Sequence, residues 1–270
     1  MLNRSAVRQA VRWVVRIVVF SLISLPAAAE TVTRTATAAD DSTTLRLEDG
    51  TVFRLAGLLP PQPPLGYRGV WQTAEQARQG LTALAVEVPL QLTPVGQDRW
   101  GHALGQALLP DGRDLAAVLL TAGWAQVAGP SPIPKESGLP GKHAQWLGLE
   151  AEARAEGRGL WSDAYYAVRS AEDLPNELEQ LSLGRFLIVE GAVADVAVVR
   201  NRTYLNFGAD WRSDFTATLS PEARRRFRAA GLDPRGYAGR RLRLRGWLQS
   251  LNGPMIEIQT PDQIELLEDP

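Results

Sequence analysis

Two runs of alternating apolar residues joined by Asp-Gly constrain the fold of this chain most strongly. They lie in TTLRLEDGTVFRLAGL (43–58), which has Asp49-Gly50 at its centre. Asp-Gly between two such runs is a strong hairpin signal, so the segment predicts two antiparallel strands. The second strand carries Arg54 and runs into PPQPP (60–64), which must be a loop because proline donates no ladder hydrogen bond.

Helices and further strands are predicted after this hairpin. A first helix is predicted near Thr73, which forms a capping box with Gln76, and two more are predicted over 114–127 and 143–158. VPLQLTP (88–94) and HALGQALLPDG (102–112) read as strands between the first and second helices. This order favours an α+β domain over repeated βαβ units.

The N-terminus has the pattern of an export signal. Four arginines precede the uncharged run IVVFSLISL (17–25), and small residues follow it up to Ala29. This arrangement predicts a signal peptide over 1–29 and export to the periplasm or the medium, with no membrane span after its removal. A retained membrane anchor is the alternative. The chain has no cysteine, which excludes disulfides, thiolate metal sites and a cysteine nucleophile, and its two histidines argue against a zinc site.

The C-terminal third differs from the rest. Residues 164–184 are predicted to be an acidic linker between a first domain (30–163) and a second domain (185–270). Five strands are predicted in the second domain, with a helix between the third and the fourth that has Ser220 as its N-cap and Pro221 in its first turn. This order suggests a small OB-like β-barrel.

The first domain resembles the staphylococcal-nuclease-like (thermonuclease) family. Four blocks carry the resemblance: LRLEDGTVFRLAGLLPP (45–61), DRWGHALGQALLPDG (98–112), LAAVLLTAGWAQV (115–127) and EAEARAEGRGLW (150–161). The resemblance implies a five-stranded OB-type barrel with three helices. It also implies hydrolysis of nucleic-acid phosphodiesters, with a calcium ion held by carboxylates, two arginines on the phosphate and a glutamate as general base.

Most of the family's chemical positions are altered in this chain. The arginine of the F-R-L strand is retained as Arg54. The general-base glutamate falls at Gln62, and the second arginine falls at His102. The two calcium-binding aspartates fall at Thr43 and Leu59, neither of which offers a carboxylate. A short insertion that lets Asp40-Asp41 replace the ligand at Thr43 is the alternative register, but it restores neither the second ligand nor the base.

Basic residues suggest a second way to meet nucleic acid. Arg99 lies in the turn DRWGH, and Arg241, Arg243 and Arg245 share one face of a predicted strand. With the aromatic residues of 204–211, this face suggests a groove for single-stranded nucleic acid. The alternative for both sets is a solvated surface paired with acids. Residues 30–184 hold 12 Lys or Arg and 19 Asp or Glu, which does not favour a general nucleic-acid binder.

The sequence therefore predicts an exported, catalytically degenerate thermonuclease-like protein that binds single-stranded nucleic acid or an envelope protein. No cofactor is predicted. One alternative is an active nuclease that uses calcium in a rearranged site, and the other is a structural protein-binding module. The strand arginine Arg54 has two interpretations, a phosphate site or a partner for a nearby acid such as Glu48 or Asp98.

Overall fold

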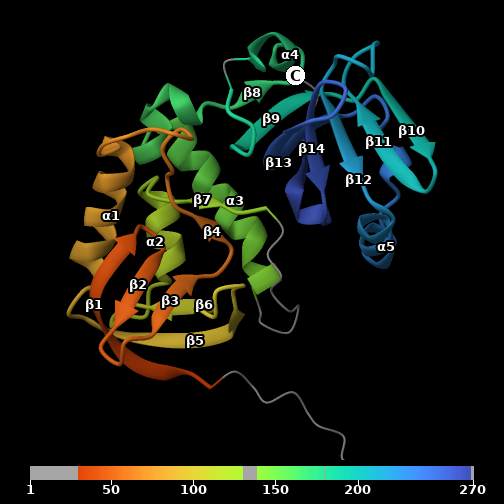
Figure 1. Ribbon diagram of the computed structural model, residues 1–270. Helices are drawn as coiled ribbons and strands as arrows, with labels where there is room; N and C mark the ends of the chain where they lie inside the picture. Colours follow the sequence, from red (N-terminus) through yellow and green to blue (C-terminus); the bar gives the residue numbers. More distant parts are fainter. Residues whose placement is uncertain (1–29, 130–138, 180, 269–270) are drawn as a thin grey trace, which may run out of the picture.

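A computed structural model describes residues 30–129, 139–179 and 181–268, which form two folded units (Figure 1). The first unit is a closed barrel with helices around it, and the second is a curled sheet with one longer helix. Helix α3 (Leu139–Ala155) lies between the two and contacts both. The predicted signal peptide falls outside the described residues. No helix of the described part is both long and apolar enough to cross a membrane.

The barrel confirms the fold predicted for the first domain. Its strands, in spatial order, are β1 (Val32–Asp41), β2 (Thr44–Leu47), β3 (Val52–Leu55), β6 (Ala103–Leu108) and β5 (Pro89–Gln97). Gly50 has φ of 82° in the hairpin turn, and Leu45 pairs with Phe53, as the Asp-Gly signal predicts. The parallel pairing of β3 with β6 places Arg54 opposite Leu104, at the same end of the barrel as the β5–β6 turn. Strand β1 was not predicted from the residues that form it.

The three predicted helices are present with different ends. Helix α1 (Gln72–Ala85) has Trp71 as its N-cap, and the predicted capping box is wrong because the Thr73 hydroxyl donates to Asp163 instead. Helix α2 (Leu115–Thr121) is shorter than predicted. The chain then turns at Gly123 and forms β7 (Gln126–Val127), which pairs with β4 (Leu58–Leu59).

The first unit ends in two short 3-10 helices, η2 (Gly159–Ser162) and η3 (Ala164–Tyr166). Gly157 has φ of 63°, which ends the run of α3. The chain then folds back, with the Leu160 N–H donating to the Gly123 carbonyl, and the Leu160 side chain is buried.

The second unit has a sheet whose strands follow the order β10-β11-β12-β14-β13-β9-β8, with β15 paired to β13. It curls as a half-barrel, so the OB-like prediction holds for the class of fold but not for closure. The first of the five predicted strands, over 186–199, forms two strands in the structure, β9 and β10. The strands are β9 (Phe186–Ala192), β10 (Asp195–Val199), β11 (Arg202–Asn206), β12 (Thr216–Leu219), β13 (Arg241–Ser250), β14 (Pro254–Ile258) and β15 (Ile264–Leu266).

Helix α5 (Pro221–Ala229) begins where the sequence predicts. The Ser220 hydroxyl accepts the backbone N–H of Ala223, and proline occupies the first turn. The 3-10 helix η4 (Pro234–Tyr237) precedes β13, and η5 (Pro261–Gln263) lies between β14 and β15.

The segment expected to be an acidic linker contributes structure to the second unit. It contains β8 (Arg169–Ser170), which pairs with β9, and α4 (Leu174–Glu177). Ala171 and Leu174 are buried in the hydrophobic core of the second unit. These contacts arise because the charged residues of the segment alternate with apolar ones, which the composition alone did not reveal.

Candidate functional site

Asp98 joins the two positions at which the family has arginines. Its Oδ2 accepts Arg54 Nη1 at 3.2 Å and lies 3.0 Å from His102 Nδ1. Its Oδ1 accepts the backbone N–H groups of Trp100 and His102 at 2.9 and 3.0 Å. The acid that Arg54 requires inside a strand is therefore the first residue of the β5–β6 turn, one of the two acids considered from the sequence.

The aspartate is held in its ionised form by these donors. Burial alone would raise the pKa of Asp98, but the backbone N–H groups of His102 and Trp100 and the side chains of Arg54 and His102 lower it to about 2. Because the folded pKa lies below the ordinary value of 3.8, ionised Asp98 stabilises the fold above about pH 4.

We expect this stabilisation to be lost as the pH falls from 4 to 2. Asp98→Asn removes the titrating group, so its free energy of unfolding should change less across this window than that of the wild type. Chemical unfolding followed at pH 2, 3, 4 and 7 measures the difference. The matched control is Asp195→Asn, at the exposed start of β10. Equal slopes for the wild type and Asp98→Asn contradict the assignment.

An exposed tryptophan completes the surface around Asp98. Trp100 is 60% exposed, and the Arg99 guanidinium lies 4.0 Å from its ring centroid. The His102 ring stacks on the Trp100 ring, with centroids 6.2 Å apart and an interplanar angle of 29°. We call Arg54, Arg99, Trp100 and His102 the turn surface. Two arginines, an imidazole and an exposed aromatic ring are the groups that bind phosphates and bases.

The positions of the family's calcium ligands do not form a metal site. Thr43 is 1% exposed, and its backbone N–H and hydroxyl both donate to Asp41 Oδ1 at 2.7 and 2.9 Å. Asp41 Oδ2 accepts the Thr44 hydroxyl, so both of its oxygens serve the β1–β2 turn. Leu59 is apolar. Within the described ranges, no group of three or more His, Cys, Asp or Glu residues is arranged to hold a metal. This donor set does not fit calcium.

The position of the family's general base faces another part of the molecule. The backbone carbonyl of Gln62 accepts the Tyr166 hydroxyl at 2.8 Å, and Gln62 and Leu59 line a cavity between the two units. The turn surface does not contribute to the residues that line this cavity. The structure thus keeps Arg54 and His102 together on Asp98 and places Gln62 and Leu59 elsewhere.

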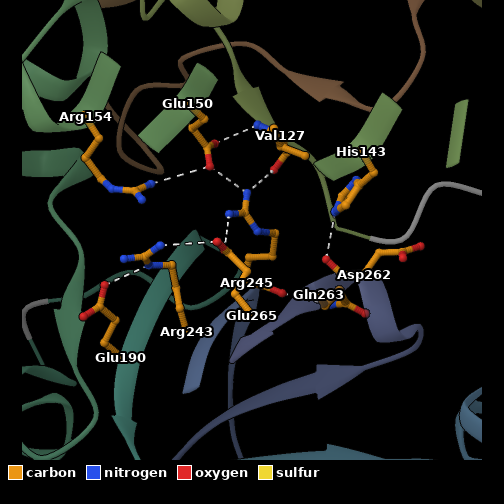
Figure 2. A network of polar contacts seen from close by, with 10 residues as sticks. All are labelled: Val127, His143, Glu150, Arg154, Glu190, Arg243, Arg245, Asp262, Gln263 and Glu265. Atoms are coloured by element: carbon orange, nitrogen blue, oxygen red, sulfur yellow. Dashed lines mark hydrogen bonds and ion pairs between the residues drawn. The ribbon is translucent and has the colours of Figure 1, made fainter. Parts of the chain in front are cut away.

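All three arginines of β13 lie near glutamates, and one of them, Arg245, also contacts the first unit (Figure 2 shows Arg243 and Arg245). Arg245 is 1% exposed and donates to Glu150 Oε2 at 2.9 Å and to Glu265 Oε1 at 2.7 Å. Arg243 pairs with Glu190 and Glu265, and Arg241 lies 3.8 Å from Glu190. The shared face predicted from strand alternation is present, but it is paired with acids. A phosphate reaches Arg245 only if the units separate, while the nucleic-acid role of Arg241 and Arg243 stays a prediction.

Glu150 is the partner that the sequence did not single out for this role. It is fully buried on α3, and its Oε1 accepts the backbone N–H of Val127 at 2.8 Å. It also forms an ion pair at 3.5 Å with Arg154, four residues later on the same helix. No local pattern connects it to Arg245, which lies 95 residues away in the chain.

The first unit matches a family model described as staphylococcal nuclease homologue, over residues 64–163. Residues 64–163 are thus similar to the staphylococcal nuclease homologues, and we call the first unit the nuclease-homologue domain. The matched range includes α1, the turn surface residues Arg99, Trp100 and His102, and α3, and it begins after the strand that carries Arg54. No curated protein matches the chain significantly. This match supports a nuclease-family or nucleic-acid-binding module. The second unit contacts this domain through the pair of Arg245 with Glu150.

Proposed function

We propose that this protein is an exported, catalytically silent member of the nuclease-homologue group that binds single-stranded nucleic acid on the turn surface. The observation that carries the proposal is the pairing of an exposed ring with cations: Trp100 is 60% exposed beneath Arg99, and Arg54 and His102 lie beside it on Asp98. Bases stack on such rings, and cations follow the phosphates.

The chemistry of the side chains argues against cleavage. Phosphodiester hydrolysis by this family requires a calcium ion and a base that takes a proton from water. Thr43 and Leu59 supply no carboxylate at the ligand positions, and the amide of Gln62 is not a base at neutral pH. His102 replaces a planar, permanently charged guanidinium with an imidazole that Asp98 holds at 3.0 Å.

The remaining groups are suited to hold a phosphate without transforming it. Arg54 has a side chain that is 26% exposed, so one part of its guanidinium binds Asp98 and another part reaches the surface. Arg99 is exposed beside the Trp100 ring. Export is part of the proposal because of the N-terminal pattern at 1–29. Since residues 30–184 carry more acidic than basic side chains, we expect nucleic acid to bind only at a local basic patch.

Trp100→Ala should weaken the binding of a fluorescein-labelled dT15 by about tenfold, because stacking of one base contributes about 1–3 kcal/mol. Fluorescence anisotropy at 50 mM salt measures this loss. The matched control is Trp211→Ala, since Trp211 is 51% exposed and has Arg212 4.4 Å from its ring, but lies in the second unit.

The control distinguishes the two surfaces that the sequence suggested. Trp211 lines a groove on the second sheet together with Tyr204 and Thr218. If Trp211→Ala weakens binding and Trp100→Ala does not, the nucleic acid binds that groove, and the assignment of the binding site to the turn surface is wrong. If the wild type binds no dT15 at 50 mM salt, the nucleic-acid role is removed, and the structural protein-binding alternative is favoured.

A further inference from the structure

A cavity of about 260 Å³ lies between the nuclease-homologue domain and the second unit. The first unit lines it with the proline loop, Tyr165 and Tyr166, and the second unit lines it with the segment 182–186 and Trp247. The cavity is separate from the turn surface. It also contains Leu59 and Gln62, two positions where the family's carboxylates have been replaced by uncharged side chains.

One arginine in this cavity has no acid to neutralise it. Arg185 is the only charged side chain among the described residues that line it. Its guanidinium lies 3.5 Å from the ring centroid of Tyr165, and no ion pair joins it to a carboxylate within the described part of the chain. Asp163 acts on Arg185 electrostatically, but its two oxygens accept the Tyr165 N–H and the Thr73 hydroxyl.

Burial makes this lone charge unusual. Loss of hydration lowers the pKa of Arg185, and the attraction of Tyr165 only partly offsets it. A half-buried guanidinium without an anion is unfavourable unless a ligand supplies one. By contrast, Arg245, which is buried at the domain contact, and Arg243 beside it each pair with two glutamates.

The rim of the cavity is apolar and exposed. Leu65 is 82% exposed, Leu183 51% and Trp247 42%, and Phe186 packs against Trp247 with ring centroids 5.3 Å apart. Tryptophan, tyrosine and arginine around an aliphatic rim are typical of protein contacts in which a few residues contribute most of the binding energy. A single cation suits a carboxylate, whereas phosphates are usually held by several donors.

We propose that this cavity binds the free C-terminus of a peptide whose last residue is apolar. Its carboxylate pairs with Arg185, and its last side chain packs among Leu59, Leu65 and Trp247. A chain end fits a cavity of about 260 Å³ because it brings one carboxylate and one side chain together in a single residue. An internal acidic residue requires room for the chain on both sides. The inference goes beyond the proposed function, since it involves neither the turn surface nor cleavage.

A fluorescein-labelled Gly-Ser-Gly-Leu-Phe peptide with a free carboxylate tests the proposal by anisotropy. We expect it to bind the full chain at least tenfold more tightly than the same peptide with a C-terminal amide. Arg185→Gln should reduce binding of the acid to the level of the amide. The matched control is Arg212→Gln, which also removes an arginine stacked on a ring of the second unit, 4.4 Å from Trp211.

A surface variant keeps the test decisive if Arg185→Gln folds poorly. Leu65→Glu places a negative charge at the exposed rim and should weaken binding of the peptide with the free carboxylate at least tenfold. Leu251→Glu, at a site 63% exposed on the groove lined by Trp211, should not weaken it. Equal binding of acid and amide, no binding of the acid at millimolar concentration, or displacement of the peptide by dTMP at lower concentration than by unlabelled peptide overturns the proposal. The last outcome assigns the cavity to nucleotides.

Discussion

Glu150→Gln should lower the free energy of unfolding by about 3 kcal/mol or more, because it leaves the buried guanidinium of Arg245 with an incomplete set of anions. Arg245 is 1% exposed and Glu150 is fully buried, so water does not replace the lost charge. Burial alone would lower the pKa of Arg245, but the attraction of Glu150 and Glu265 outweighs it and raises that pKa. The carboxamide also weakens the bond from the Val127 N–H.

Denaturant unfolding followed by circular dichroism measures the effect. The control is Asp111→Asn, which breaks the pair with Arg113, where both side chains are more than half exposed. It should change stability by less than about 1 kcal/mol. The double variant Glu150→Leu, Arg245→Met should recover much of the loss, because an apolar pair needs no charge compensation. A loss in Glu150→Gln no larger than in the control contradicts the account of the domain contact.

Gly123→Ala should destabilise the nuclease-homologue domain by about 3 kcal/mol or more. Gly123 has φ of 67°, and a Cβ atom there would lie 2.1 Å from the backbone oxygen of Arg158. Gly159 makes the reciprocal approach, with its own Cβ position 2.2 Å from the Gly123 oxygen. That oxygen accepts the Leu160 N–H at 2.8 Å, so separating the two segments also breaks the bond that closes the end of α3 onto the barrel.

The control for this variant is Gly112→Ala. Gly112 has φ of 83° and nothing within 4 Å of its Cβ position, so the substitution changes only the backbone preference and should cost about 1 kcal/mol. The difference between the two midpoints in urea isolates the backbone contact. Similar losses in the two variants mean that the contact between Gly123 and Arg158 is unimportant.

Local signals predicted much of the fold. The turn at Asp49-Gly50, the proline loop and the helix start at Ser220-Pro221 all depend on residues within a few positions of each other, and the structure confirms them. The predicted capping box at Thr73 fails because a distant residue, Asp163, competes for the same hydroxyl. Strand β7 was missed since two residues cannot show periodicity, and their pairing partner is β4.

The site was predictable in its parts and not in its arrangement. The sequence indicated the loss of carboxylates at Thr43 and Leu59 and the retention of Arg54, and it considered Asp98 as the acid that pairs with Arg54. It could not show that Asp98 also holds His102, because that bond depends on the form of the turn. The β13 arginines share one strand face as predicted, but their glutamate partners come from the neighbouring strands β9 and β15 and, for Arg245, from α3, and only the tertiary structure brings these together.

One measurement tests the proposed function most directly: incubation of labelled dT15 with the full chain and 10 mM calcium, with bound fraction and product length read from the same samples. The account predicts binding that weakens as salt rises and an oligonucleotide of unchanged length. Shortened products that require calcium and disappear in Arg54→Ala would contradict it, because they would show that the altered positions still support phosphodiester hydrolysis.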